Sequence, residues 1–511
     1  MTVDYNPTIG KNVIETLTLG MYEDSRFIYR EYIQNAADQI DIAVEEGLIN
    51  QRDEANILIS IDKLRRRICI EDNATGIKAN LFLRFLGDVA KSEKDASNRK
   101  GFRGIGRLGG LGYCEKLIFE TSYKGEAIKS IMTLDAKLLK KIISDRKDET
   151  DASGVISIIT TIEKSSESIH AHYFKVCLEE VTNDLILNIN KVTDYISLVA
   201  PLPFRSDFTF KSEIKKYLKQ SNILLDEYNV YLNNDKIFKA YKNVIIDKDE
   251  KTTFLGVDFL KVMDESGILL AIGWYGISDH VNEVLTNQVI ERGIRLRKNN
   301  IQIGSEGTLN RFFKSERTNF RFIGELYAVS QSFIPNARRD YFNENKTSKV
   351  FEETLTYIFK EENLENRYAQ NVSKIHNRAR DIEKYKLDLE EYERVKTQID
   401  SSAKQKHYLD RLKISKEKAL HASKEIEKVK RLSEHDENIK KLYDHIIGDK
   451  DLSFDPDIEK ILKRTIYSQP TFNKLSENET KVAREIIDLI YETVEFKIAE
   501  MLKKKIVDKY N

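Results

Sequence analysis

Three polar residues at helical spacing offer the clearest chemistry in this chain of 511 residues. Glu31, Asn35 and Asp38 follow one another at i, i+4 and i+7 in RFIYREYIQNAADQIDIAVEE, so they share one face of a helix whose opposite face is apolar. A carboxylate on such a face can activate water as a general base, and an amide oxygen can bind Mg²⁺. An ordinary amphipathic helix with a solvent-exposed polar face has the same pattern, so the function of this helix has to be inferred from the motifs that accompany it.

A further candidate carboxylate lies at the end of a predicted strand. Asp72, in IEDNATGIK, follows the strand-like segment 67–70 and precedes the turn residues Asn73, Thr75 and Gly76. A carboxylate beside a tight turn can accept a hydrogen bond from an amino group on a flat base. By itself the same pattern describes an ordinary Asx turn.

A glycine run forms the third element. KGFRGIGRLGGLGY has glycines at 101, 104, 106, 109, 110 and 112, and Lys100, Arg103 and Arg107 add positive charge. Missing side chains let backbone N–H groups approach phosphate oxygens, and a helix beginning near Gly104 would add the positive end of its dipole. The run is not a Walker A loop, because Gly-Lys-Ser/Thr is absent, and it does not open a Rossmann unit.

The order and spacing of these elements resemble those of the GHKL ATPases, the superfamily of gyrase, MutL, the heat-shock-ninety chaperones and histidine kinases. The family places ExxxNxxD on a helix, a strand-end Asp with Gly further on, and GxxGxG after that, and the resemblance covers residues 1–165. It implies a Bergerat-type α/β sandwich that binds ATP and Mg²⁺. The fold class that we expect is therefore α+β.

The resemblance also implies a role for each residue. Glu31 corresponds to the general base, Asn35 to the magnesium ligand, Asp38 to a supporting acid, Asp72 to the adenine-reading carboxylate and Gly76 to the turn beside it. A water-activating base argues against a histidine kinase, whose pocket needs none. The phosphate-binding end of the ATP lid corresponds to Lys100, Gly101, Phe102, Arg103, Gly104, Ile105 and Gly106.

Two departures from the family pattern bear on adenine binding. The family's DxGxG has Ala74 at its first glycine, and Gly154-Val155 stands where the family has Gly-Thr entering its last strand. We therefore expect the hydroxyl partner of Asp72 to be missing or to come from Ser153, Ser157 or Thr160.

A second region resembles the middle domain of the heat-shock-ninety chaperones, a ribosomal-S5-like α/β fold. GIRLRKNNIQIG (293–304) and FRFIGELYAVSQSFIPNARRDYF (320–342) end in Asn336-Ala337-Arg338-Arg339-Asp340, where the family has Asn-x-x-Arg-Glu. The family's arginine for the γ-phosphate falls on Arg339, with Arg338 as the alternative, and an arginine suits this role because it stays charged and binds bidentately. The other interpretation is a surface salt bridge with Asp340. A phosphate role would make hydrolysis depend on domain closure and therefore slow.

Glycine and proline divide the chain. Of the 22 glycines, 21 occur by Gly324, and no proline lies between Pro335 and Pro456. We predict an ATP-binding domain at 1–200, a middle domain at 205–345 and a helical region at 346–511, with a strand at 155–162 in the first. The helical region should hold two long helices, as a hairpin or an intermolecular coiled coil, and one last helix from the capping box Ser476-x-x-Glu479 to Met501.

Composition limits the surroundings and partners. Lys plus Arg and Asp plus Glu are both 83, so no net field draws the whole chain to nucleic acid or an anionic membrane. The isolated cysteines Cys69, Cys114 and Cys177 favour a reducing compartment over a disulfide framework. The N-terminus has no secretory pattern and no apolar stretch is long enough for a membrane span, so we expect a cytoplasmic protein.

These features predict an ATP-driven, heat-shock-ninety-like clamp that dimerises through its C-terminal helical third and acts on protein clients or a dedicated partner. Such clamps also occur in bacterial defence systems, which is one context that the sequence allows. The alternative is a MutL- or MORC-like DNA clamp, which could use Arg65 to Arg67 and the cluster 292–298 on DNA. A structural coiled-coil protein with an inactive pocket is disfavoured because Glu31 and Asn35 are intact.

Overall fold

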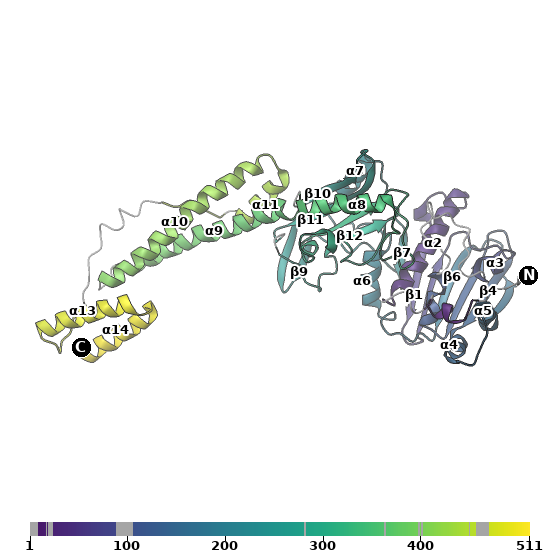
Figure 1. The fold of residues 1–511 in the computed structure, drawn as a ribbon, viewed down its shortest axis with the longest axis horizontal. Coiled ribbons are helices and arrows are strands. Elements are labelled where there is room, and N and C mark those ends of the chain that lie inside the picture. The colour runs from purple at the N-terminus through teal and green to yellow at the C-terminus, as the bar shows by residue number, and fades with distance from the viewer. Residues whose placement is uncertain are drawn as a thin grey trace, which may run out of the picture. The chain divides into compact units, whose positions relative to one another are not determined.

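The computed structural model describes residues 9–16, 18, 24–87, 106–280, 283–361, 364–396, 399, 402–448, 450–455 and 470–511. The chain divides into two compact units (Figure 1). The first comprises Met1–Ser278 with Glu283–Glu365, and the second comprises Asp279–Asn282 with Asn366–Asn511.

The first unit begins with an eight-stranded sheet in the order β5-β4-β3-β6-β2-β1-β7-β8. Neighbouring strands are antiparallel except for β1 and β7, which run parallel. In chain order the strands are β1 (Asn56–Asp62), β2 (Arg67–Asp72), β3 (Lys116–Ser122), β4 (Ile128–Asp135), β5 (Thr160–Ser166), β6 (Tyr173–Glu179), β7 (Asn229–Leu232) and β8 (Asp235–Lys236).

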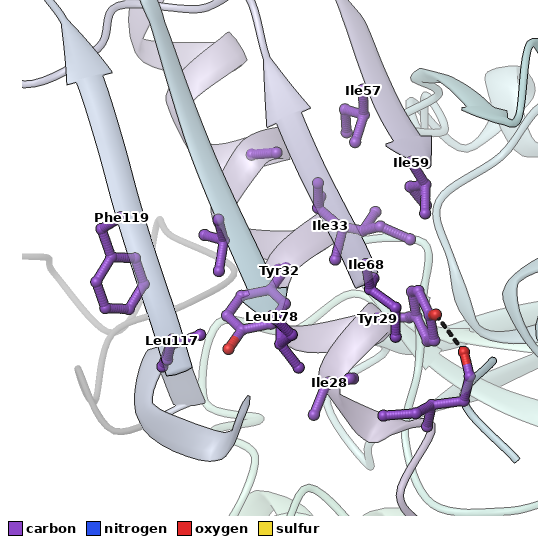
Figure 2. Close-up of a cluster of buried hydrophobic side chains, with 14 of the residues drawn as sticks. Ile28, Tyr29, Tyr32, Ile33, Ile57, Ile59, Ile68, Leu117, Phe119 and Leu178 are labelled. Atoms are coloured by element: carbon purple, nitrogen blue, oxygen red, sulfur yellow. Dashed lines mark hydrogen bonds between the residues drawn. The ribbon is translucent and has the colours of Figure 1, made fainter. Parts of the chain in front are cut away.

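Helices cover one face of this sheet and enclose a single apolar core. Figure 2 shows Ile28 and Ile33 of helix α2 packed against Ile59 and Ile68 of the sheet. The other face is open, since Leu58 on β1 is 48% exposed. The expected α/β sandwich is therefore confirmed. Its helices are α1 (Asn12–Glu15), α2 (Phe27–Glu45), α3 (Phe82–Gly87), α4 (Ala136–Ser144), α5 (Ala152–Ile159) and α6 (Ile189–Val199), with 3-10 turns η2 (Arg52–Glu54) and η3 (Gly106–Gly112).

The strand predicted at 155–162 is wrong in its first half, which forms helix α5. The Asp151 carboxylate caps α5 by accepting a hydrogen bond from the Gly154 N–H, and Val155 and Ile159 are buried in the core. A short apolar run does not distinguish a buried strand from a buried helix, so the error has a physical origin.

A second, six-stranded sheet follows in the order β13-β12-β14-β11-β10-β9. Its core gathers around Trp274, which Phe204, Phe208 and Tyr241 surround. The chain after α6 packs on this core from Phe204 to Leu218 and then returns to the first sheet as β7 and β8. The remaining elements of the first unit are α7 (Lys211–Gln220), β9 (Val244–Asp247), β10 (Glu250–Met263), β11 (Leu269–Ser278), β12 (Gly293–Lys298), β13 (Ile301–Gln302), η4 (Asn310–Phe312), η5 (Thr318–Arg321), β14 (Ile323–Ala328), α8 (Lys346–Thr356) and η6 (Tyr357–Glu361).

A buried cluster of charges ties the two sheets together. The Glu325 carboxylate is fully buried and forms ion pairs with Arg297 and, at 2.6 Å, with the Lys239 ammonium. Arg297 also donates to the carbonyls of Leu198 and Ala200 at the end of α6. Burial alone would raise the pKa of Glu325, but Arg297 and Lys239 outweigh it and lower that pKa to about 2.

The second unit is helical. Helices α9 (Leu364–Val395) and α10 (Ser402–Ser433) form a hairpin within the chain, in which Tyr392 packs near Tyr408 and Arg411 pairs with Asp388. Helix α11 (Glu437–Ile447) packs on α10. Of the two predicted arrangements, the structure therefore has the hairpin.

The predicted last helix is two helices, α13 (Glu477–Thr493) and α14 (Phe496–Tyr510). The predicted capping box is present, because Ser476 and Glu479 exchange both bonds. Val494 and Glu495 leave the helical conformation and turn the chain back, so that Tyr491 bonds Glu500 across the two helices.

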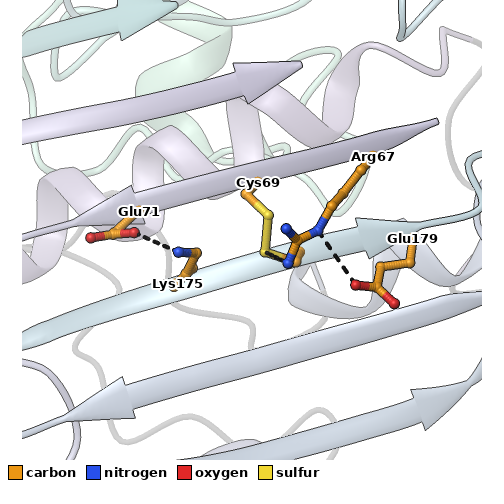
Figure 3. Close-up of a disulfide and its surroundings, with 6 residues drawn as sticks. Arg67, Cys69, Glu71, Lys175 and Glu179 are labelled. Atoms are coloured by element: carbon orange, nitrogen blue, oxygen red, sulfur yellow. Dashed lines mark hydrogen bonds and ion pairs between the residues drawn. A yellow bond between two sulfur atoms is a disulfide. The ribbon is translucent and has the colours of Figure 1, made fainter. Parts of the chain in front are cut away.

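A disulfide joins Cys69 and Cys177, contrary to the expectation of isolated cysteines. The two residues are 108 positions apart, but they are direct partners on the adjacent antiparallel strands β2 and β6. The ion pairs Lys175–Glu71 and Arg67–Glu179 flank the bond on the same face of the sheet (Figure 3). Cys114 is a free, buried thiol.

Candidate functional site

Helix α2 presents the predicted acidic face towards a largely closed environment. Glu31 is 6% exposed and Asp38 is fully buried, while Asn35 between them is half-buried. Burying two carboxylates on one helix face costs free energy unless partners compensate their charge. This burial therefore argues against the alternative interpretation, in which the polar face is exposed to solvent.

The end of the glycine run, η3, lies directly against α2. A Cβ at Gly106 would lie 2.3 Å from Glu31 Oε2, one at Gly109 would lie 2.6 Å from the Phe27 ring, and one at Gly110 would lie 2.5 Å from the hydroxyl oxygen of another α2 side chain, Tyr32. These three glycines therefore allow close packing on the helix. The other predicted lid residues, Lys100, Gly101, Phe102, Arg103, Gly104 and Ile105, lie outside the described residues.

Asp72 ends β2 and is 3% exposed. Its Oδ1 accepts a hydrogen bond from the Ala74 N–H at 3.1 Å, which forms the predicted Asx turn. Gly76 follows with φ +67°, and a Cβ there would lie 1.9 Å from the Ser122 carbonyl oxygen. Only glycine fits this turn, so the backbone holds the Asp72 carboxylate in a fixed place.

On the side of β2 away from β1, the neighbouring strand is β6 and not the segment around Val155, and there Asp72 pairs in register with Phe174. Of the three hydroxyl groups proposed as partners for Asp72, those of Ser157 and Thr160 donate to carbonyls of their own helix. Sequence reasoning missed two side chains that support the turn. Thr121 accepts from the Ile77 N–H, and the His172 Nδ1 lies 2.6 Å from the Ala74 carbonyl oxygen.

Arg339, from the loop after β14, reaches Glu31. Its Nε lies 3.3 Å from Glu31 Oε1, and the residue is 8% exposed. Its φ of +56° is a conformation that non-glycine residues rarely adopt and that clusters at functional sites. The neighbouring Arg338 is exposed, and the Asp340 carboxylate accepts from Asn336. The contact joins a loop of the second sheet to the helix that covers the first.

Comparison with known proteins bears on this arrangement. The family model of histidine kinase-, DNA gyrase B- and HSP90-like ATPases matches residues 31–166. Residues 31–166 form a GHKL ATPase domain. The region therefore belongs to the superfamily that the motif spacing indicates.

Similar curated proteins are all chaperones of one kind. The chain is 25% identical over 179 residues to "Chaperone protein HtpG" of Anaplasma marginale, which covers 29% of this chain and 28% of that protein. It is 29% identical over 133 residues to the protein of the same name from Burkholderia lata, covering 22% of this chain and 21% of that protein. The HtpG of Shewanella halifaxensis matches at 24% over 191 residues, covering 31% and 30%. The chain thus spans less than a third of the length of these relatives.

The basic clusters outside the GHKL domain's pocket are engaged in the fold. Arg295 and Arg297 are buried, and Lys298 donates to the Ser330 carbonyl. In the run after β1, each arginine has a carboxylate partner: Arg65 with Asp62, Arg66 with Asp184 and Arg67 with Glu179. These partners reduce the charge available to a phosphate backbone, so neither cluster supports the DNA alternative.

The residues present fit a nucleotide and Mg²⁺. In the part of the chain that the structure describes, no three His, Cys, Asp or Glu residues come together as a metal site. Magnesium prefers oxygen ligands and keeps several waters, so Asn35 with nucleotide phosphates would suffice. The Asp72 carboxylate beside the Gly76 turn offers an acceptor for the amino group of a base. No helix among the described residues could cross a membrane.

Proposed function

We propose that this chain is an ATP-driven conformational clamp that binds Mg-ATP in its GHKL domain and hydrolyses it slowly. The single observation that carries the proposal is the contact between Arg339 and Glu31, 3.3 Å apart and both nearly buried. One residue comes from the second sheet's loop and the other from α2. Hydrolysis that needs both residues is therefore sensitive to how these two parts of the first unit are arranged.

The roles of the site residues follow from their chemistry. Glu31 would accept a proton from the attacking water, and Asn35 would hold the magnesium ion. Asp72 would read the adenine amino group from the Gly76 turn, with Asp38 supporting the pocket. The nucleotide phosphates would contact the run Lys100, Gly101, Phe102, Arg103, Gly104, Ile105 and Gly106.

Arg339 would neutralise charge on the terminal phosphate. An arginine can bind phosphate oxygens through two parallel N–H groups. A phosphate at this position would compete with the Glu31 carboxylate for the guanidinium, and Arg339 would leave Glu31 as it engages the phosphate. This exchange of partners couples nucleotide binding to the release of the general base.

We further propose that two copies of the chain dimerise through α13 and α14. These helices expose an apolar face in which each side chain is 38–57% exposed, formed by Val482, Ile486, Leu489, Val494, Ile498 and Met501. Apolar faces of helices are normally covered, and the same face on a second copy would cover this one by two-fold symmetry. Such a dimer would act on protein clients or a dedicated partner, as the similarity to HtpG chaperones suggests. A bacterial defence system is one context in which such a partner would occur.

ATP turnover by the full chain tests the enzymatic part of the proposal. We expect slow, magnesium-dependent phosphate release that Glu31→Ala abolishes while nucleotide binding persists. No turnover by the wild-type chain would refute it. Stimulation by duplex DNA that disappears at higher salt would instead favour the DNA clamp.

Light scattering on the full chain tests the dimer. We expect twice the monomer mass for the wild type and the monomer mass for Ile486→Glu/Leu489→Glu, because two charges would then face each other in the interface. The matched control is Leu64→Glu, since Leu64 is 97% exposed in the first unit. A monomer at all protein concentrations for the wild type would exclude the clamp.

A further inference from the structure

One buried tyrosine of α2 is bonded to the end of the glycine run. The Tyr32 hydroxyl donates to the Arg107 carbonyl at 3.0 Å and accepts from the Gly110 N–H at 3.2 Å. Tyr32 is 3% exposed, and burial raises the pKa of its hydroxyl, so the group keeps its proton. The bonds fix the middle of η3 to the helix that carries Glu31.

Glu31 and Tyr32 are consecutive on α2 and touch η3 at two points. The Glu31 carboxylate occupies the space that the missing Cβ of Gly106 leaves, and the Tyr32 hydroxyl occupies the equivalent space at Gly110. Because η3 is bonded at Arg107 and Gly110, its first residue, Gly106, has little freedom to move. The place of the Glu31 carboxylate relative to the glycine run is thereby set by its neighbour.

We propose that Tyr32 is a positioning residue for ATP hydrolysis, whose hydroxyl holds η3 on α2 so that Gly106 stays against the Glu31 carboxylate. The inference rests on the proposed role of Glu31 as general base. A general base acts only within hydrogen-bond reach of its proton, and a misplacement of about 1 Å can cost about 100-fold in rate. Tyr32 therefore acts on the chemical step rather than on nucleotide affinity.

The same helix provides a matched control. Tyr29 is fully buried on α2, and its hydroxyl donates to the Ile186 carbonyl at 2.6 Å, away from the glycine run. Both tyrosines project from α2 towards the sheet (Figure 2). Tyr29→Phe and Tyr32→Phe thus remove the same atom from one helix. The first removes the hydrogen bond to Ile186, and the second removes the two hydrogen bonds to η3.

The first test measures kcat and the nucleotide Kd of the full-length wild type and both variants, at a temperature below the onset of unfolding of each protein. We expect Tyr32→Phe to lower kcat about 10- to 100-fold with the Kd within about 3-fold of the wild type. Tyr29→Phe should leave kcat within about 2-fold. Equal effects of the two variants, or a Tyr32→Phe effect on Kd alone, would overturn the proposal.

The second test uses the close approach of Gly110. In Gly110→Ala the new methyl group would lie 2.5 Å from the Tyr32 hydroxyl oxygen and 3.0 Å from Leu117 Cδ1. Tyr32→Phe removes that oxygen and with it this clash. Relative to the wild type, kcat of the double variant should therefore exceed the product of the relative kcat values of the two single variants by at least about 5-fold. A double variant that equals the product would show that the hydroxyl does not fix η3. Absence of turnover in the wild type would refute the proposed function itself, a result distinct from either of these.

Discussion

Replacing Arg339 by alanine tests the coupling between the second sheet and α2. The guanidinium lies 3.3 Å from the Glu31 carboxylate and is 8% exposed, so solvent screens it little. A charge-assisted hydrogen bond from a guanidinium contributes about 1.5–3 kcal/mol. Transferred to a phosphate in the transition state, that free energy corresponds to about a 10- to 150-fold loss of kcat in Arg339→Ala.

The neighbouring arginine makes the experiment specific. Arg338 is in the same loop but exposed, so Arg338→Ala should keep kcat within about 2-fold. Steady-state phosphate release gives kcat, and equilibrium titration with a slowly hydrolysed ATP analogue gives affinity. Arg339→Lys should recover only part of the rate, because an ammonium lacks the planar pair of donors.

Two results would refute this reasoning. Turnover of Arg339→Ala within about 2-fold of the wild type would show that the contact with Glu31 is structural only. Equal losses in Arg338→Ala and Arg339→Ala would assign the effect to the loop's conformation rather than to the guanidinium. Thermal unfolding of each variant, measured in parallel, separates both results from a loss of folded protein.

Three further predictions concern the scaffold. Gly76→Ala should lower the free energy of unfolding by at least about 2 kcal/mol and weaken nucleotide binding, because its Cβ would clash with a carbonyl oxygen and its φ is +67°. Calorimetry measures the first effect and nucleotide titration the second. An unchanged Tm would show that this turn does not require glycine. Reduction of the Cys69–Cys177 disulfide should lower stability by about 2–5 kcal/mol, since it opens a loop of 108 residues, and the Cys69→Ser/Cys177→Ser variant should melt identically with and without reductant. The folded pKa of Glu325, about 2, lies below its unfolded value, so its contribution is complete at pH 5 and above and is lost as the pH falls from about 4.5 towards 2. Acid titration of Tm should therefore be shallower in Glu325→Gln, which should also be destabilised by about 3–5 kcal/mol because two buried cations lose their partner.

The helix and the strand that carry the candidate site were predictable because their signals are local. The 3.6-residue period of 24–46 places Glu31, Asn35 and Asp38 on one face, and α2 spans most of that segment. The β-branched run before Asp72 likewise forms β2, with the carboxylate at its end. Both predictions needed only neighbours within a few positions.

The disulfide and part of the support for the Asp72 turn were missed because they depend on strand pairing. One neighbour of β2 is β6, more than 100 residues further along the chain, so the cysteines of these strands meet although nothing near either residue indicates a partner. The same pairing brings His172 to the Ala74 carbonyl. The strand misplaced at Val155 is a different error, since a short apolar run does not distinguish helix α5 from a strand. Pattern reasoning ranks local conformations and does not determine which strands pair.

The glycine run has a packing role that its pattern did not indicate. Small residues were expected there so that backbone N–H groups could approach phosphates, yet Gly109 and Gly110 lie against Phe27 and Tyr32 of α2. A side chain at either position would push η3 off the helix and away from Glu31. In this GHKL domain the glycines at 109 and 110 therefore serve a contact with the helix, beside the proposed contact of the residues before Gly106 with phosphate. Substitutions on the two sides of Gly106 should accordingly separate in kinetics: nucleotide affinity should fall for those before it, and kcat for those after it.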